Sequence, residues 1–145
     1  MNERKEEMVA TDSKSNDIIV RSGETVEVRD GKMAEVLAGG KAIVSQGGRA
    51  DVRKGGNATV MSGGVVSVHY GETEVFADGE AYVYEGGDTY VSNDGFANIH
   101  DCGNGSVGIG GRAYVYEGGY AWVEVGGFAF GPGEIIWEEE YDESN

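Results

Sequence analysis

The sequence predicts an all-β fold, a β-solenoid of about fifteen octapeptide units, and three observations lead to this prediction. A glycine pair returns about every eight residues, as in GGKAIVSQGGRADVRKGGNATVMSGG at residues 39–64. Small or β-branched residues stand at two fixed positions between the pairs. The chain holds 26 glycines and one proline. This composition is typical of a turn-rich repeat whose strands keep their hydrogen-bond donors.

Each unit is expected to be a short strand followed by a turn. With the second glycine as zero, fourteen successive units carry Val or Ile at +4, from Val20 to Val123, and the spacing slips once, between Gly64 and Gly71. Small or β-branched residues, mostly Ala, occupy +2. Positions +2 and +4 point to one side of an extended chain, so they face inward while +1, +3 and +5 face outward or lie at corners. Glycine permits the turn because it tolerates positive φ. We therefore expect the units to coil and stack, each strand bonding to its equivalent one coil away.

The number of strands per coil is open between two and three. The near-identical segments EAYVYEGG (80–87) and RAYVYEGG (112–119) are separated by four octads, which is a whole number of two-strand coils but not of three-strand coils. That separation favours two. Every third outward +3 position carries an acidic or amide side chain, namely Glu27, Asp51, Glu74 and Asn98. That pattern favours three. We prefer three strands per coil, the commoner prism.

The chain divides into a polar N-terminal segment (1–15), the β-solenoid (16–131), and a C-terminal cap with an acidic tail (132–145). A core of Ala and Val is thin, so its ends need cover. The repeat fails at Pro132, and the apolar residues that follow are expected to form a lid, namely Ile135, Ile136 and Trp137.

The units resemble the glycine-pair repeats in passenger domains of AIDA-type autotransporter adhesins. The segments SGGVVSVHYG and GGRADVRKGGNATV carry the likeness, which covers about residues 16–131. The resemblance implies a right-handed parallel β-helix and a role in bacterial adhesion and aggregation.

The formal net charge of −15 lies entirely in the second part of the chain. Residues 1–54 hold ten acids and ten bases, whereas residues 55–145 hold sixteen acids and one base, Arg112. All fourteen aromatic side chains lie between Tyr70 and Tyr141. An acidic rod attracts basic partners and is repelled by phosphate. We therefore expect a basic protein partner and no direct contact with nucleic acid.

Outward aromatic and acidic side chains of the second part are the candidate binding residues. They are Glu72, Glu74, Glu80, Tyr82, Tyr84, Glu85, Asp88, Tyr90, Tyr114, Tyr116, Glu117, Tyr120, Trp122 and Glu124. One interpretation is that the aromatic rings only form ladders that stabilise neighbouring coils. The other is a binding face, because Tyr and Trp are enriched in binding hot spots.

The function predicted from this face is non-catalytic protein binding. The face would occupy a basic, nucleic-acid-binding surface of a partner, with carboxylates standing in for phosphates, as in a phage-encoded inhibitor such as an anti-CRISPR protein. The alternative is an adhesin-like surface module that binds glycans or associates with itself. A homodimer through an end or a face is a further way to hide strand edges.

The sequence carries no pattern typical of catalysis or metal binding. Calcium-binding β-rolls place Asp in each turn, whereas the turns here vary in charge. Residues His69, His100 and Cys102 are expected to be structural, because His100 and Cys102 are close only in sequence. We therefore predict no enzyme activity, no metal and no cofactor.

The start MNERKEEMVATDSKSND lacks the apolar core of a secretory signal, and the chain has no apolar stretch of membrane-spanning length. These features predict a cytoplasmic protein without membrane contact, located in the host cell if phage-encoded. Whether a leader or further domains have been removed stays open.

Overall fold

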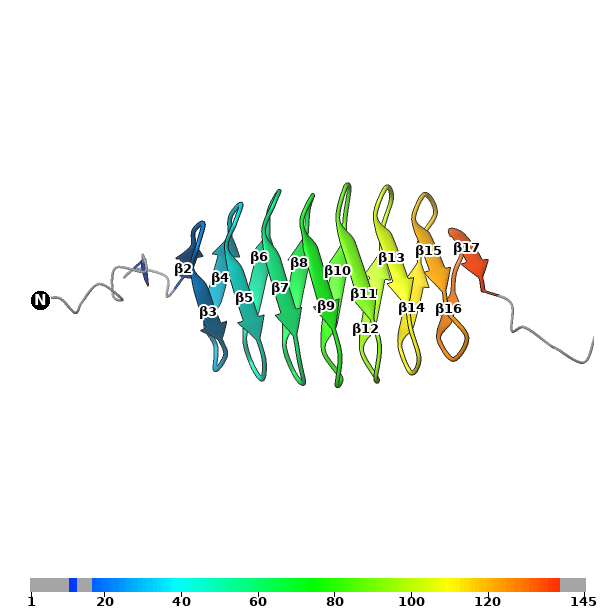
Figure 1. Ribbon diagram of the computed structural model, residues 1–145, viewed down its shortest axis with the longest axis horizontal. Helices are drawn as coiled ribbons and strands as arrows, with labels where there is room; N and C mark the ends of the chain where they lie inside the picture. The colour runs from blue at the N-terminus through cyan, green and yellow to red at the C-terminus, as the bar shows by residue number, and fades with distance from the viewer. Residues whose placement is uncertain (1–10, 13–16, 139–145) are drawn as a thin grey trace, which may run out of the picture.

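The computed structural model describes residues 11–12 and 17–138, and within them the chain forms strands and turns without a helix (Figure 1). Sixteen strands, β2 to β17, wind into a β-solenoid of eight coils. The predicted all-β solenoid is confirmed, although it contains sixteen strands and not the predicted fifteen or so units. The preference for three strands per coil is wrong, because strands alternate between two sheets. Two strands per coil, which the four-octad separation favoured, is correct.

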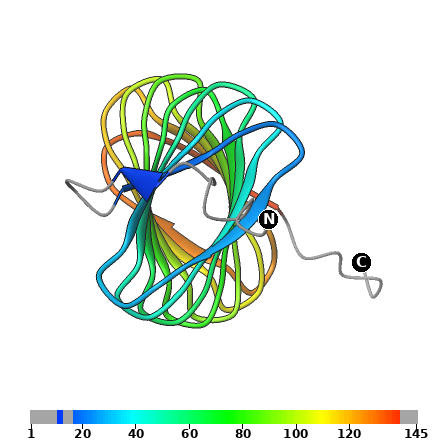
Figure 2. The same cartoon turned by 90° about the vertical axis from the view of Figure 1, so that its left-hand side faces the viewer.

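The strands lie in two sheets that face each other around the core (Figure 2). Sheet A contains β1 (Thr11–Asp12), β2 (Asp17–Val20), β4 (Met33–Val36), β6 (Arg49–Val52), β8 (Val65–Val68), β10 (Glu80–Val83), β12 (Phe96–Ile99), β14 (Arg112–Val115) and β16 (Phe128–Phe130). Sheet B contains β3 (Thr25–Val28), β5 (Lys41–Val44), β7 (Asn57–Val60), β9 (Glu72–Val75), β11 (Asp88–Val91), β13 (Asn104–Val107), β15 (Tyr120–Val123) and β17 (Glu134–Trp137). Within each sheet, neighbouring strands are parallel, and each residue pairs with the equivalent residue one coil away. The exception is β1, which is antiparallel to β2.

The core consists of the inward side chains at +2 and +4, as the octad pattern predicts. Every Val or Ile at +4, from Val20 to Val123, is fully buried. The alanines at +2 are also buried, from Ala34 to Ala129. Outward positions in the same strands are half-buried or exposed, with Asn98 as the buried exception. The pleat of a four-residue strand therefore separates core from surface along the whole solenoid.

At one place in the core, two departures from the Ala and Val pattern compensate for each other. Ile99 replaces valine at +4 in β12, and Gly105 replaces alanine at +2 in β13. A Cβ placed on Gly105 would meet Cδ1 of Ile99 and would lie 3.3 Å from Cγ2 of Thr89. The missing methyl group of Gly105 thus makes room for the extra methylene of Ile99, and the packing volume stays constant.

The first glycine of each pair adopts the left-handed backbone region that the turn requires. Gly31, for example, has φ of 85°. Where this glycine is absent, the replacing residue still has positive φ, as in Tyr70 (60°), Asp94 (74°) and Cys102 (67°). Asp tolerates this region better than bulky residues do. The turn geometry is therefore kept even where the residue type changes.

The second glycine is required for a different reason, the close approach of successive coils. A Cβ on Gly48 would lie 2.5 Å from the carbonyl carbon of Val28 and 2.8 Å from the amide nitrogen of Arg29, in the preceding coil. In the first coil Glu24 and Lys32 occupy this position. Their side chains fit because no solenoid coil precedes them.

The single slip in the repeat is absorbed by a shorter turn. Residues 69–71 connect β8 to β9, a connection shorter by one residue than those on either side. The register of both sheets continues unchanged, since Val65 still pairs with Glu80 and Asn57 with Glu72.

The segment expected as a C-terminal lid is itself a strand. β17 extends sheet B beside β15, with Ile135 opposite Ala121 and packed against the core. Trp137 is 50% exposed. Of the predicted terminal segments, residues 1–10, 13–16 and 139–145 lie outside the described residues. The described residues include no helix long and apolar enough to cross a membrane.

Candidate functional site

The structure divides most of the fourteen predicted binding residues between two opposite surfaces. The sheet A side holds Glu80, Tyr82, Tyr84, Tyr114 and Tyr116, and Glu85 and Glu117 lie in the turns that lead from sheet A to sheet B. The sheet B side holds Glu72, Glu74, Asp88, Tyr90, Tyr120, Trp122 and Glu124. With two strands per coil, consecutive octads alternate between the sheets, so neighbours in sequence point in opposite directions. The one interaction face that the sequence predicts is therefore two surfaces.

A ladder of four stacked rings runs along one side of sheet A. His69, Tyr84, His100 and Tyr116 follow β8, β10, β12 and β14 at the +5 position. Successive ring centroids are 4.8, 4.7 and 4.2 Å apart, with planes within 11° of parallel. This spacing matches the distance between neighbouring strands, about 4.8 Å. The rings therefore cover each other's faces and present their edges outward.

Further rings continue this network to the C-terminal end of the solenoid. Tyr114 meets Tyr116 and Phe130 edge-on, at 4.7 and 5.0 Å between centroids. Phe128 lies 5.6 Å from Phe130 and 6.4 Å from Trp137. The aromatic face of sheet A, as we call it, consists of His69, Tyr82, Tyr84, His100, Tyr114, Tyr116, Phe128 and Phe130, and Trp137 of β17 in sheet B adjoins it at the end of the solenoid. Its terminal members Phe128 and Phe130 are 52% and 45% exposed.

Polar side chains lie between the rings of the aromatic face. The amide of Asn98 donates a hydrogen bond of 3.3 Å to the Glu80 carboxylate. The hydrogen bond between Tyr82 and Glu80, together with the negative charge of Glu80, raises the pKa of Tyr82. The Tyr82 hydroxyl therefore keeps its proton. The Arg112 guanidinium lies 5.8 Å from the centre of the Phe96 ring, in a cation–π arrangement. The aromatic face thus offers apolar ring edges together with hydrogen-bonding groups.

His100 makes the ladder sensitive to pH. Burial lowers the pKa of His100 below its usual 6.5, and its Nε2 has no hydrogen-bond partner among the described residues. The folded chain therefore favours the neutral imidazole, and the unfolded chain binds the proton more readily. The contribution of His100 to the free energy of unfolding is expected to be constant above pH 6.5. It should fall as the pH drops below 6.5 toward the pKa of His100 in the folded chain. Melting temperatures between pH 7.5 and 5 measure this effect. His100→Phe keeps the stack, and its melting temperature should depend less steeply on pH than that of the wild type. An equal pH dependence would show that His100 is not the titrating group.

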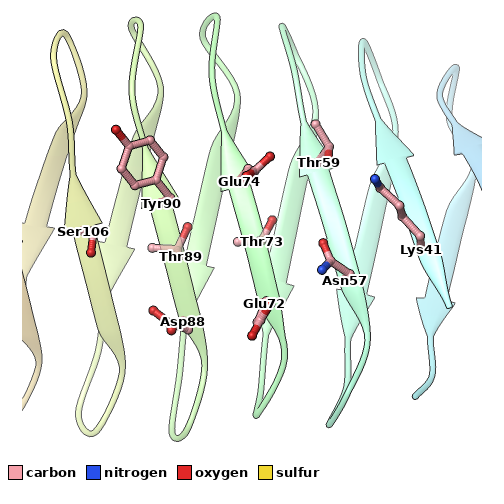
Figure 3. Close-up of a pocket in the computed structure, with 10 residues that line it drawn as sticks. All are labelled: Lys41, Asn57, Thr59, Glu72, Thr73, Glu74, Asp88, Thr89, Tyr90 and Ser106. Carbon is pink, nitrogen blue, oxygen red and sulfur yellow. The ribbon is translucent and has the colours of Figure 1, made fainter. Parts of the chain in front are cut away.

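The outer surface of sheet B carries a polar hollow of about 370 Å³ (Figure 3). Two rows of outward side chains line it, one residue per coil. The +1 row is Lys41, Asn57, Glu72 and Asp88, and the +3 row is Thr59, Glu74, Tyr90 and Ser106. Thr73 and Thr89 stand between the rows at the inward +2 position, and both side chains are buried. The polar hollow therefore changes from basic at β5 to acidic at β9 and β11.

The carboxylates of the polar hollow repel one another. Burial and the neighbouring charge of Glu72 raise the pKa of Asp88, against the opposing hydrogen bond from the Thr89 backbone. Ion pairs within the described residues join Arg29 to Asp30 and Arg53 to Glu35, and none involves the polar hollow. Within the same residues no three His, Cys, Asp or Glu side chains are grouped as metal ligands would be. The acidic end of the polar hollow thus attracts a positively charged side chain.

Two members of the aromatic face, His69 and His100, were assigned only structural roles by sequence reasoning, and Trp137 only a role in the lid. Their signal is visible once the coil is known to be two octads long, since His69, Tyr84, His100 and Tyr116 then share one position. Cys102 remains outside both surfaces, in an exposed turn. Its hydrogen bond to Asp101 raises the pKa of the thiol. That shift disfavours the thiolate that a nucleophile needs.

Comparison of the chain with models of protein families and with curated proteins gave no match. Among solved structures, the chain is similar to a fragment of TibA, residues 55–350, hyper-glycosylated in a reaction catalysed by TibC. The sequences are 28% identical, the TM-score is 0.49, and the alignment covers 78% of this chain and 52% of the TibA fragment. The chain thus spans about half the length of that fragment.

Proposed function

We propose that the chain is a non-catalytic, adhesin-like binding module that attaches to its ligand through the aromatic face of sheet A. The observation that carries this proposal is the continuous ring network from His69 to Trp137, whose C-terminal rings are about half exposed. Stacking in the ladder accounts for the buried ring faces, but it does not account for exposed Phe128 and Phe130. Exposed apolar surface of this kind marks interaction sites.

The ligand class that best matches this surface is a glycan chain. A sugar ring has apolar C–H faces bordered by hydroxyl groups, so it needs aromatic rings and hydrogen-bonding groups at short intervals. The aromatic face supplies both, with Asn98 between Tyr82 and Tyr114 and with the Glu80 carboxylate hydrogen-bonded to Asn98. The exposed rings at the C-terminal end offer uncovered surface for stacking, whereas the ladder offers ring edges and the Tyr hydroxyls.

A glycan array tests this proposal with two matched double variants. Phe128→Ala/Phe130→Ala removes exposed rings from the aromatic face, and Tyr120→Ala/Trp122→Ala removes two rings from sheet B. Loss of a hot-spot aromatic side chain costs about 2 kcal/mol, or roughly thirtyfold in affinity. We expect that loss for the first variant and less than about threefold for the second. An array without binding, or equal losses for both variants, would contradict the proposal.

A second candidate is binding to a basic protein surface, and the charge distribution favours it. The described residues from 55 onward hold twelve acids and one base. Regularly spaced carboxylates would then occupy a surface that binds nucleic acid, as an inhibitor of the anti-CRISPR type does. Neutralising Glu72, Glu74, Glu80 and Glu85 together should weaken such a complex and its salt dependence. Unchanged binding would exclude this candidate. An adhesin-like role places the chain outside the cell, whereas this candidate requires the cytoplasmic location predicted from the sequence.

A further inference from the structure

We propose that two copies of the chain associate antiparallel through the outer surface of sheet B, with Lys41 of each copy against Asp88 of the other. This surface is opposite the aromatic face, so the inference goes beyond the proposed function and does not depend on it. It rests on the order of side chains along the polar hollow (Figure 3).

A twofold axis parallel to the strands, between β7 and β9, produces the contact. Such an axis keeps each row of side chains opposite the same row of the partner and reverses the order of the coils. In the +1 row, Lys41 then faces Asp88 and Asn57 faces Glu72. In the +3 row, Ile43 faces Tyr90. The twofold axis repeats each of these contacts, and the two side chains of each pair are complementary in charge or polarity.

The electrostatics of sheet B favour this register over the alternatives. Lys41 is exposed and forms no ion pair within the part of the chain that the structure describes. Asp88 is beside Glu72 in the next coil, where the two carboxylates repel each other. A parallel arrangement would place acids against acids. An antiparallel arrangement in which all eight strands of sheet B overlap has its axis between β9 and β11. That register would place Glu72 of one copy against Asp88 of the other.

End-to-end stacking of coils is a poorer way to join two copies. The second-glycine position must lack a side chain wherever a coil precedes it, and in the first coil it holds Glu24 and Lys32. Their side chains would collide with the last coil of a second copy. In addition, β1 already lies along the edge of β2. The sheet B surface has neither obstacle.

The interface is small, so the dimer is expected to be weak and sensitive to salt. Six overlapping coils of four-residue strands cover roughly 400 Å² per partner at the usual strand spacings. Stable complexes bury about 800 Å² per partner. The dimer would leave both aromatic faces outward on opposite sides. A bivalent particle of this kind can bridge two ligands and gains avidity.

Sedimentation equilibrium of the full chain at low and moderate salt tests the dimer by charge exchange. We expect wild type to dimerise with increasing concentration, and Lys41→Glu and Asp88→Lys each to weaken association by about tenfold or more. The double variant Lys41→Glu/Asp88→Lys restores the ion pair with reversed signs and should restore the dimer. Lys54→Glu/Asp88→Lys has the same net charge but no such pair, since Lys54 lies in an exposed turn, and it should remain monomeric.

Three results would overturn the inference: a monomeric wild type at millimolar concentration, a dimer that Lys41→Glu leaves intact, or equal behaviour of the two double variants. Circular dichroism and melting temperature establish that each variant is folded. Asp88→Asn replaces Asp88→Lys in the single-variant comparison if the lysine prevents folding. Glycan binding by the aromatic face is measured separately, so failure of one proposal does not imply failure of the other.

Discussion

Val107→Asp is expected to abolish cooperative folding, whereas Ser106→Asp, at the preceding position of β13, leaves the chain folded. Val107 is fully buried between Val91 and Val123, and Ser106 points outward between Tyr90 and Trp122. A buried carboxylate without a partner costs several kcal/mol. The free energy of unfolding of a domain of this size is about 5–15 kcal/mol. Because the core consists of small Ala and Val side chains, we expect a value near the lower end of that range.

Both substitutions add one negative charge to the same strand, so charge repulsion between coils is matched. Far-UV circular dichroism with thermal melting measures the difference. We expect Ser106→Asp to lower stability by less than about 1 kcal/mol, as outward substitutions generally do. Equal stability of the two variants would show that the inward and outward rows are assigned incorrectly.

Gly48→Ala is expected to destabilise the fold by about 3 kcal/mol, at the upper end of the range for inserted core methyl groups. The new Cβ would lie 2.5 Å from the carbonyl carbon of Val28 and would meet its oxygen. These are backbone atoms of the preceding coil, so no side-chain rotation relieves the clash. The two coils must separate, which weakens the hydrogen bond of 3.0 Å from the Ser45 amide to the Val28 carbonyl.

The matched control is Gly31→Ala, which introduces the same methyl group at the first glycine of a turn. A Cβ on Gly31 meets no atom within 4 Å, and the cost arises only from its φ of 85°. Left-handed backbone costs an L-residue about 1–2 kcal/mol. Urea denaturation of both variants should therefore rank Gly48→Ala clearly below Gly31→Ala. The reverse order would mean that the second glycine is not required for coil approach.

The fold class follows from the octad because its inward positions alternate with outward ones, a spacing that suits a strand. The number of strands per coil does not follow from it, because coils of two and of three octads both stack like inward residues on one another. The correct number, two strands per coil, was indicated by the near-identical segments at 80–87 and 112–119, which lie four octads apart. The acidic and amide series from Glu27 to Asn98 pointed to the wrong coil, since its members alternate between sheets.

The candidate site was predictable as a set of outward residues but not as surfaces. Tyr82 and Tyr90 are both outward, as expected, yet they lie on opposite sheets because each coil contains two octads. The stack of His69, Tyr84 and His100 became recognisable only with that period. The second function of glycine was also hidden, because the clash at Gly48 involves a coil whose position the sequence does not specify.

Disulfide cross-linking tests the two-octad coil most directly, in a Cys102→Ser background. Asp51 and Ser67 are paired on neighbouring strands of sheet A, at the Cα separation that a disulfide accepts. A coil of three strands would instead place Asp51 beside Glu74, which lies in sheet B. Under mild oxidation, Asp51→Cys/Ser67→Cys should form an intramolecular disulfide and Asp51→Cys/Glu74→Cys should not. The opposite result would contradict the two-sheet solenoid and both surfaces derived from it.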